Sequence, residues 1–302
     1  MRAITLSSFG SPSVLEETEV PTPEAAAGQV LVEVTAAGVG PWDVKLRRGE
    51  LGPVPFPYVP GWDLSGLVVQ VGDGVTGYAT GAPVFGARGV DGGAYAEYAA
   101  VDASRLADVP AEVDLETAGG APVVATTALE GLDDHLGLQA GESVLVTGAA
   151  GGVGHVVVQL ATARGARVVA TASPANHEFL AGLGADRVLD YHGDWVAEAR
   201  GVDAAFDCVG GPTWEACVQA VRPGGRAVTI VAPERLDVRS DVAATTFSGA
   251  ATTARLREVA HLLAVGQVVV TIAARFALAD AARAQAMSEA GHTRGKIVLL
   301  PG

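Results

Sequence analysis

The sequence is poor in cysteine and has no long apolar run. Its 302 residues include only Cys208 and Cys217, which fall in an expected buried strand and an expected helix, so no disulfide framework is expected. No window approaches the roughly 18 uninterrupted apolar residues of a membrane span. The start, Met1–Leu6, has too short an apolar run for a signal peptide. These absences predict a cytoplasmic protein.

Positive charge is also scarce. The net charge is −14, and only Lys45 and Lys296 are lysines, which argues against nucleic acid or an anionic membrane as partner and leaves a small-molecule substrate. Pro41 and His292 stand four residues before the two lysines, so the Tyr-x-x-x-Lys pair of short-chain reductases is missing. The hydrophobic content of 49% and the length are typical of an ordered enzyme with two domains.

A glycine-rich turn links an apolar strand to an apolar helix at residues 144–164. A second strand, Arg167–Thr171, completes a βαβ unit. In such units a pyrophosphate lies against the helix N-terminus, where glycines let the backbone approach it. The alternative is a turn without a ligand. The predicted contacts are Ala149, Gly151, Gly152, Val153 and Gly154.

No acidic residue stands about twenty positions beyond the glycines, where NAD-binding folds place the carboxylate that takes the ribose 2′-hydroxyl. Ser173 and Asn176 stand there instead and could donate to a 2′-phosphate. We therefore favour NADPH over NADH. Pro174 fits the first position of a helix, so Ser173 could also be an N-cap, and the two roles are compatible.

Two kinds of pattern divide the chain. Residues 1–115 alternate like β-strands between frequent glycine and proline turns, which predicts a small β domain. From residue 143 strands and helices alternate, which predicts an α/β domain with a doubly wound parallel sheet over 116–272. Within it, Val268–Ile272 is expected to be a further strand with an exposed edge that pairs two copies into a homodimer. Residues 273–302, with a strand at Lys296–Leu300, are expected to return to the first domain.

Several motifs in this order resemble the medium-chain dehydrogenase/reductase superfamily, and its quinone oxidoreductase (zeta-crystallin-like) branch most closely. They are Pro60–Asp63, Gly92–Tyr98, Gly141–Gly154, Gly184–Asp186, Asp207–Gly211 and Gly291–Lys296. Thr162 departs from the branch, which usually has Lys, Arg or Ser there. The resemblance implies a GroES-like β-rich catalytic domain, a Rossmann domain and an NADPH-dependent oxidoreductase.

The resemblance also implies further cofactor contacts. Thr126, Val209 and Gly210 would line the nicotinamide end, and Tyr191 would lie near the adenosine phosphate. Alternatively, Tyr191 is a packed tyrosine at the rim of the site. Arg294 and Lys296 would reach the cofactor or the cleft, or only flank a turn.

Zinc-dependent members hold the metal with a Cys and a His-Glu pair, and the matching positions here are Gly40 and Trp62-Asp63. Glycine and tryptophan cannot ligate zinc, so no metal is expected. Without a Lewis acid, a quinone or an activated enone is the better hydride acceptor, because the negative charge delocalises onto oxygen.

The branch usually has Asn at position 40, so Gly40 widens the predicted site. We expect Trp42 and Trp62 to be its walls, with core packing as the alternative. Asp43 is a candidate catalytic residue that could hold a ribose hydroxyl, orient a donor or cap a helix. Tyr58 is a candidate proton donor, and the alternative is an ordered proline-rich loop.

Two other functions stay open. One is an enoyl-thioester reductase, for which Lys45–Arg48 is a weak basic cluster. The other is a non-catalytic NADPH-binding sensor or structural protein. The sequence does not name the substrate.

Replacing Ser173 by Asp should weaken NADPH binding and spare NADH, because a carboxylate repels the 2′-phosphate. Fluorescence titration with both cofactors measures this. Equal losses for both would place Ser173 outside the 2′-phosphate site.

Overall fold

The computed structural model describes residues 1–302 and divides into two compact units. Unit 1 comprises residues 1–123, 251–266 and 270–302, and unit 2 comprises 124–250 and 267–269. Helix α8 (Thr253–Ala264), which we expected in the Rossmann domain, lies in unit 1, where the Thr253 hydroxyl donates to the Ala103 carbonyl at 3.2 Å. None of the helices combines the length and hydropathy needed to cross a bilayer.

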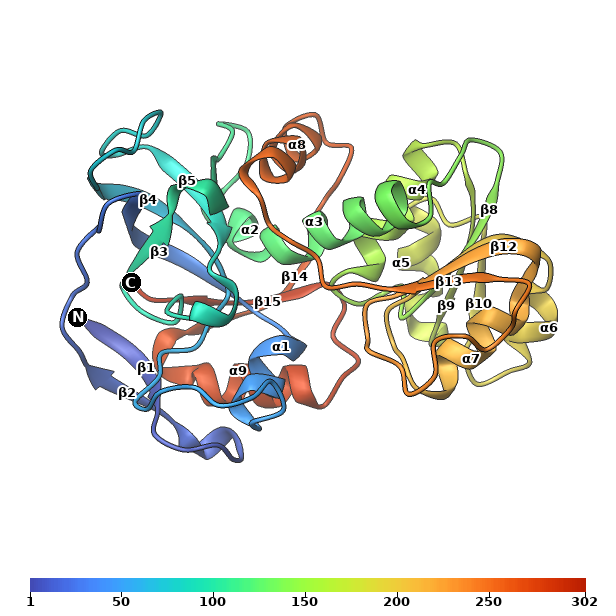
Figure 1. Cartoon of the computed structure of the whole chain (residues 1–302), viewed down its shortest axis with the longest axis horizontal. Helices are drawn as coiled ribbons and strands as arrows, with labels where there is room; N and C mark the ends of the chain where they lie inside the picture. The colour runs from blue at the N-terminus through green and yellow to red at the C-terminus, as the bar shows by residue number, and fades with distance from the viewer. The chain divides into compact units, whose positions relative to one another are not determined.

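Unit 1 is built on a seven-stranded sheet in which β14-β15-β3-β4-β5-β7 are neighbours and β6 also pairs with β3 (Figure 1). The strands are β3 (Gln29–Val39), β4 (Asp63–Val71), β5 (Pro83–Ala87), β6 (Tyr98–Asp102), β7 (Leu106–Asp108), β14 (Ile272–Ala277) and β15 (Lys296–Leu300). A separate pair is formed by β1 (Arg2–Leu6) and β2 (Leu15–Glu19). The helices of this unit include α1 (Pro41–Arg47), α2 (Leu115–Gly120) and α9 (Ala281–Glu289).

The C-terminal strand is central to this sheet. β15 pairs antiparallel with β3, with Ile297 opposite Val39, and β3 pairs antiparallel with β4, with Gly38 opposite Asp63. The C-terminal end of β3 therefore lies between the first residues of β4 and β15. Residues from three distant parts of the sequence meet at this edge.

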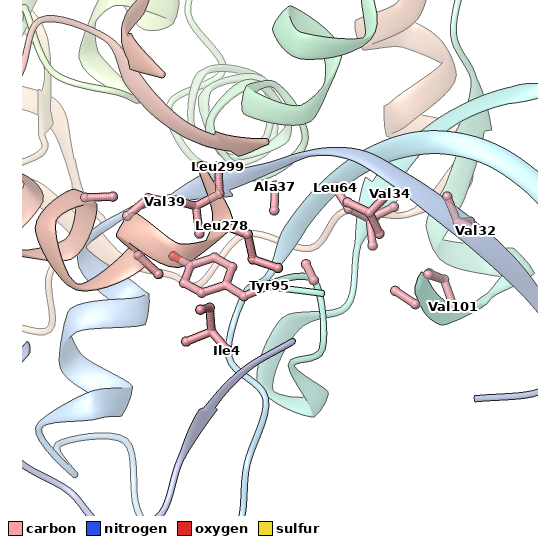
Figure 2. Close-up of a cluster of buried hydrophobic side chains, with 14 of the residues drawn as sticks. Ile4, Val32, Val34, Ala37, Val39, Leu64, Tyr95, Val101, Leu278 and Leu299 are labelled. Atoms are coloured by element: carbon pink, nitrogen blue, oxygen red, sulfur yellow. The ribbon is translucent and has the colours of Figure 1, made fainter. Parts of the chain in front are cut away.

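One buried cluster holds unit 1 together. Figure 2 shows the Tyr95 ring lying among aliphatic side chains from several strands and from the short turn that precedes α9, including Ile4, Val39, Leu278 and Leu299. Each of these side chains is at most 2% exposed. Apolar burial on this scale stabilises a domain by about 25 cal/mol per Å² removed from water.

Unit 2 is a six-stranded parallel sheet in the order β10-β9-β8-β11-β12-β13. The strands are β8 (Ser143–Thr147), β9 (Arg167–Ala172), β10 (Arg187–Asp190), β11 (Val202–Asp207), β12 (Val221–Thr229) and β13 (Ala243–Thr246). The helices are α3 (Pro122–Glu130), which starts at the unit boundary, α4 (Gly154–Ala163), α5 (His177–Gly182), α6 (Trp195–Ala199) and α7 (Pro212–Ala220). The order reverses between β8 and β11, the switch point at which doubly wound sheets bind ligands. The predicted α/β fold class is confirmed.

The strand predicted at Val268–Ile272 is wrong. Residues 268–271 form no strand, and β14 begins at Ile272 and belongs to the sheet of unit 1. The side-chain amide of Gln159 engages Val269 instead, accepting from its N–H at 2.8 Å and donating to its carbonyl at 3.0 Å. Val268 and Val270 are buried without sheet pairing, whereas Val269 is 55% exposed. One edge of the unit 2 sheet is instead formed by β13, which the sequence pattern did not reveal.

Candidate functional site

The glycine-rich turn of unit 2 follows β8 and leads into α4. Gly148 has a φ of +60°, which favours glycine. A Cβ on Gly154 would lie 2.4 Å from the Gly148 carbonyl oxygen and 2.7 Å from the Ala149 Cα, so the helix approaches the turn too closely for a side chain. The first N–H groups of a helix lack intrahelical acceptors, so the start of α4 can receive a pyrophosphate. Ala149 is buried, and Gly151, Gly152 and Val153 are half-buried around this end of the helix.

Ser173 and Asn176 lie together just beyond β9. The Asn176 side chain donates to the Ser173 hydroxyl at 3.2 Å, and Ser173 makes no side-chain cap bond to the short turn that follows. Tyr191, 39% exposed, is brought beside them because its N–H bonds to the Ala172 carbonyl at 3.4 Å. The three predicted contacts for the adenosine end are thus neighbours at the ends of β9 and β10.

A buried carboxylate, Asp207, organises the ends of the central strands. It accepts from the Thr147 and Thr229 hydroxyls at 2.6 and 2.8 Å and from the N–H groups of Val209 and Gly210 at 3.1 and 2.9 Å. These bonds fix the loop that carries the predicted nicotinamide contacts, with Val209 49% exposed. Sequence analysis gave Asp207 no role, although an Asp that ends an apolar strand before two glycines was a usable signal.

The remaining predicted cofactor contacts lie in different surroundings. Thr126 is 1% exposed within α3. Arg294 is exposed in unit 1, two residues before β15, whereas Lys296 is buried at the start of that strand.

In unit 1, Lys296 forms a buried ion pair. Its Nζ lies 3.3 Å from Asp63 Oδ2 and 3.2 Å from the Val39 carbonyl oxygen. The other Asp63 oxygen accepts from the Val123 N–H at 2.8 Å. Burial raises the pKa of Asp63, and the Lys296 charge opposes this shift. Sequence analysis named Lys296 but missed its partner, because nothing local links two residues this far apart.

Asp43 lies beside this pair. Its Oδ2 accepts from the Gly40 N–H at 2.9 Å, which supports the capping role, while Oδ1 is buried without a partner. Burial raises the pKa of Asp43 to about 7, against the Gly40 hydrogen bond and the Lys296 charge. Asp43 therefore titrates near neutral pH.

Trp42 and Trp62 stack on each other, with ring centroids 5.5 Å apart and planes 10° apart. The Lys45 ammonium lies 5.0 Å above the Trp42 ring. Both indoles are half-buried, and the Trp62 N–H is buried without a partner.

Tyr58 is 7% exposed, and its hydroxyl donates to the Val90 carbonyl at 2.8 Å. Burial raises the pKa of this hydroxyl. Its role as a proton donor stays a prediction.

The residues at the superfamily's zinc positions do not fit a metal. Gly40 has no side chain, Trp62 offers no ligand atom, and Asp63 is engaged by Lys296 and Val123. A Cβ on Gly40 would lie 3.4 Å from the Lys296 ammonium, which would repel a cation.

Comparisons with known proteins agree with this arrangement. The alcohol dehydrogenase GroES-like domain family matches residues 26–111, and the zinc-binding dehydrogenase family matches residues 183–299. The quinone oxidoreductase QR1 of Triphysaria versicolor is 30% identical over 100% of this chain and 98% of its own length. The 2-methylene-furan-3-one reductase of Solanum lycopersicum is 37% identical over 76% of this chain and 62% of its own length. The Escherichia coli quinone oxidoreductase, solved with NADPH, superposes with a TM-score of 0.92 over 100% of both chains at 26% identity.

The chain belongs to the medium-chain dehydrogenase/reductase superfamily, in its quinone oxidoreductase-like branch. The predicted resemblance is confirmed. This member of the branch is an NAD(P)H-dependent oxidoreductase. The candidate dinucleotide site is formed by the glycine turn and strand ends of unit 2, and a buried charged cluster lies at the strand ends of unit 1.

Replacing Gly151 by Val should weaken NADPH binding at least tenfold. Gly151 does not have positive φ, and a Cβ there would lie 3.2 Å from the Gly148 carbonyl oxygen, a tight contact that a small backbone shift has to relieve. The side chain would also push a pyrophosphate off the helix, losing N–H contacts of roughly 1.5–3 kcal/mol each. Titration and a melt without cofactor measure the two effects. Gly182→Val, at the exposed last residue of α5 with open space around it, is the control. Unchanged affinity would show that this turn does not bind the dinucleotide.

The raised pKa of Asp43 predicts a pH-dependent stability. Between about pH 4 and pH 7 the folded protein retains a proton that the unfolded chain has released, so the free energy of unfolding should fall as pH rises through this window. Asp43→Asn keeps an acceptor for Gly40 and should flatten the dependence, gaining up to about 4 kcal/mol above pH 7, since one pKa unit is about 1.4 kcal/mol. Denaturant unfolding at several pH values measures this. Asp237→Asn, at a side chain 93% exposed, should have little effect. A wild-type slope retained in Asp43→Asn would contradict the assignment.

Proposed function

We propose that the chain is an NADPH-dependent reductase of quinones or activated enones that works without zinc. The observation that carries the proposal is the buried ammonium of Lys296 beside Gly40, at the position where zinc-dependent members hold the metal. The NADPH-bound E. coli relative and the names of the curated relatives support the cofactor and the substrate class.

Residues of both units have defined parts in this proposal. The start of α4 would hold the pyrophosphate, and Ser173, Asn176 and Tyr191 would surround the adenosine ribose. When bound, the cofactor would supply a hydride. The protein orients the reactants, excludes water and stabilises the charge that forms on the substrate oxygen.

The stacked Trp42 and Trp62 support a planar acceptor. An indole face offers a large apolar surface on which a conjugated ring or enone can lie. Asp43 and Tyr58 remain candidates for holding or moving a proton.

Assembly and location are also proposals. A homodimer through the sheet of unit 2 would now use β13 (Ala243–Thr246), because Val268–Ile272 is not an edge strand. We retain the expectation that the protein is cytoplasmic.

The function is tested by following NADPH oxidation with a quinone, a linear enone and an enoyl thioester. We expect turnover of the first two, unchanged after dialysis against a chelator with zinc measured in the same sample. NADPH binding without turnover would identify a sensor or structural protein. Turnover of the thioester alone would favour the biosynthetic reductase. Stoichiometric zinc whose removal abolishes activity would contradict metal independence.

A further inference from the structure

An open position lies beside Gly40. Apart from its chain neighbours Val39 and Pro41, a Cβ built there has one heavy atom within 4 Å, the Lys296 Nζ at 3.4 Å. The Gly40 backbone is extended, with φ −154° and ψ 179°, so conformation does not require glycine here. The absent side chain leaves space next to a buried ammonium.

The contacts of the Lys296 ammonium engage two of its three N–H donors and leave the third for a ligand. Lysine carries three N–H donors. Two of them face Asp63 Oδ2 at 3.3 Å and the Val39 carbonyl at 3.2 Å. The Lys296 side chain is 7% exposed, so the remaining N–H is shielded from bulk water. A hydrogen bond from such a group is stronger than one in water.

We propose that Lys296 is a catalytic residue whose third N–H binds the carbonyl oxygen of the substrate in the open position beside Gly40. Asp63 and the Val39 carbonyl are its positioning groups. This role rests on the proposed reductase function. In it, the Lys296 ammonium stabilises the negative charge on the substrate oxygen, as a Lewis-acid metal does in zinc-dependent members.

The reaction balances without consuming the lysine. Hydride forms a C–H bond at the β carbon of an enone, the C=C π pair shifts to join the α carbon to the carbonyl carbon, and the C=O π pair moves onto the oxygen to give an enolate. Lys296 donates a hydrogen bond to that oxygen and keeps its proton. A proton from water then adds at the α carbon. A quinone takes the hydride and one water-derived proton to give a hydroquinone, with the same oxygen contact.

Acidic and aromatic side chains surround the ammonium. Asp63 keeps the ammonium in place. Asp43 lies close enough that the Lys296 charge lowers the Asp43 pKa, while burial raises it. The Tyr95 hydroxyl is buried close to Asp43. Trp62 precedes Asp63 in the chain and stacks on Trp42, and its ring N–H is buried without a partner.

Lys296→Met removes the donor and keeps the length of the side chain. We expect kcat/KM for the enone to fall about 100- to 1000-fold, the loss typical for one donor to a developing oxyanion. The loss should be smaller for the more electrophilic quinone, and the Kd for NADPH should change less than about threefold. The single variant leaves the Asp63 charge buried alone and could therefore be unstable. The double variant Lys296→Met/Asp63→Asn removes both buried charges, and we expect it to show the same kinetic loss.

Two further variants separate chemistry from structure. Gly40→Val fills the open position while the ion pair stays, and it should reduce turnover with normal melting and NADPH affinity. Arg47→Met is the matched control, because Arg47 is another fully buried cation of unit 1, bound to Gln285 at 2.8 Å and ion-paired with Glu289 at 2.5 Å. It should lower the melting temperature and leave kcat/KM of the folded protein unchanged.

An equilibrium probe tests Lys296 independently of turnover. 4-Nitrophenol bound beside the ammonium should ionise at lower pH in the wild type than in Lys296→Met, as followed by the visible absorbance of the phenolate. Lys296→Met variants that retain turnover within threefold, or an equal ionisation pH in both proteins, would overturn the proposal. Absence of wild-type turnover with every acceptor would instead overturn the reductase function, and the phenol titration would still decide the role of Lys296.

Discussion

The buried ion pair between Lys296 and Asp63 joins residues 233 positions apart and connects β15 to β4 across the end of β3. Such a pair contributes little net stability, because desolvating both charges offsets their attraction. Removing one partner is costly, about 3–5 kcal/mol, because the other charge stays buried alone. The pair therefore favours one register of the C-terminal strand over others. Lys296 reaches Asp63 only when β15 pairs with β3 in the observed register.

Asp207 is the buried carboxylate of unit 2, as Asp63 is in unit 1, but its hydrogen-bond donors are neutral groups. Two threonine hydroxyls and two backbone N–H groups converge on one carboxylate at the ends of β8, β11 and β12. Both sites thus lie where strands end and backbone groups leave the sheet. In unit 2 the result is a loop of fixed backbone conformation after β11, and in unit 1 it is a shielded positive charge. In the proposed function, dinucleotide binding and charge stabilisation are assigned to separate elements of the chain.

The parts that sequence analysis predicted well depend on short-range patterns. The segment from β8 through α4 to β9 was recognisable because buried parallel strands are continuous apolar runs and because the turn needs glycine. The same reasoning missed β13, whose sequence Ala243–Thr246 is short and only weakly apolar. It also misassigned Val268–Ile272, since an apolar run does not show whether its backbone pairs with a strand or with a side chain such as Gln159.

The sequence by itself determined the family, the α/β fold class and the glycine-rich turn between β8 and α4, because these depend on residue order and local conformation. It also marked Gly40 and Trp62 as unable to hold zinc, because ligation depends on side-chain chemistry alone. Only the tertiary structure decided that Lys296 faces Gly40, that Asp63 is its partner and that Asp43 titrates near neutral pH. These properties arise from burial and from contacts between distant strands, and a side chain's charge acquires a function only when the fold removes water and sets its neighbours.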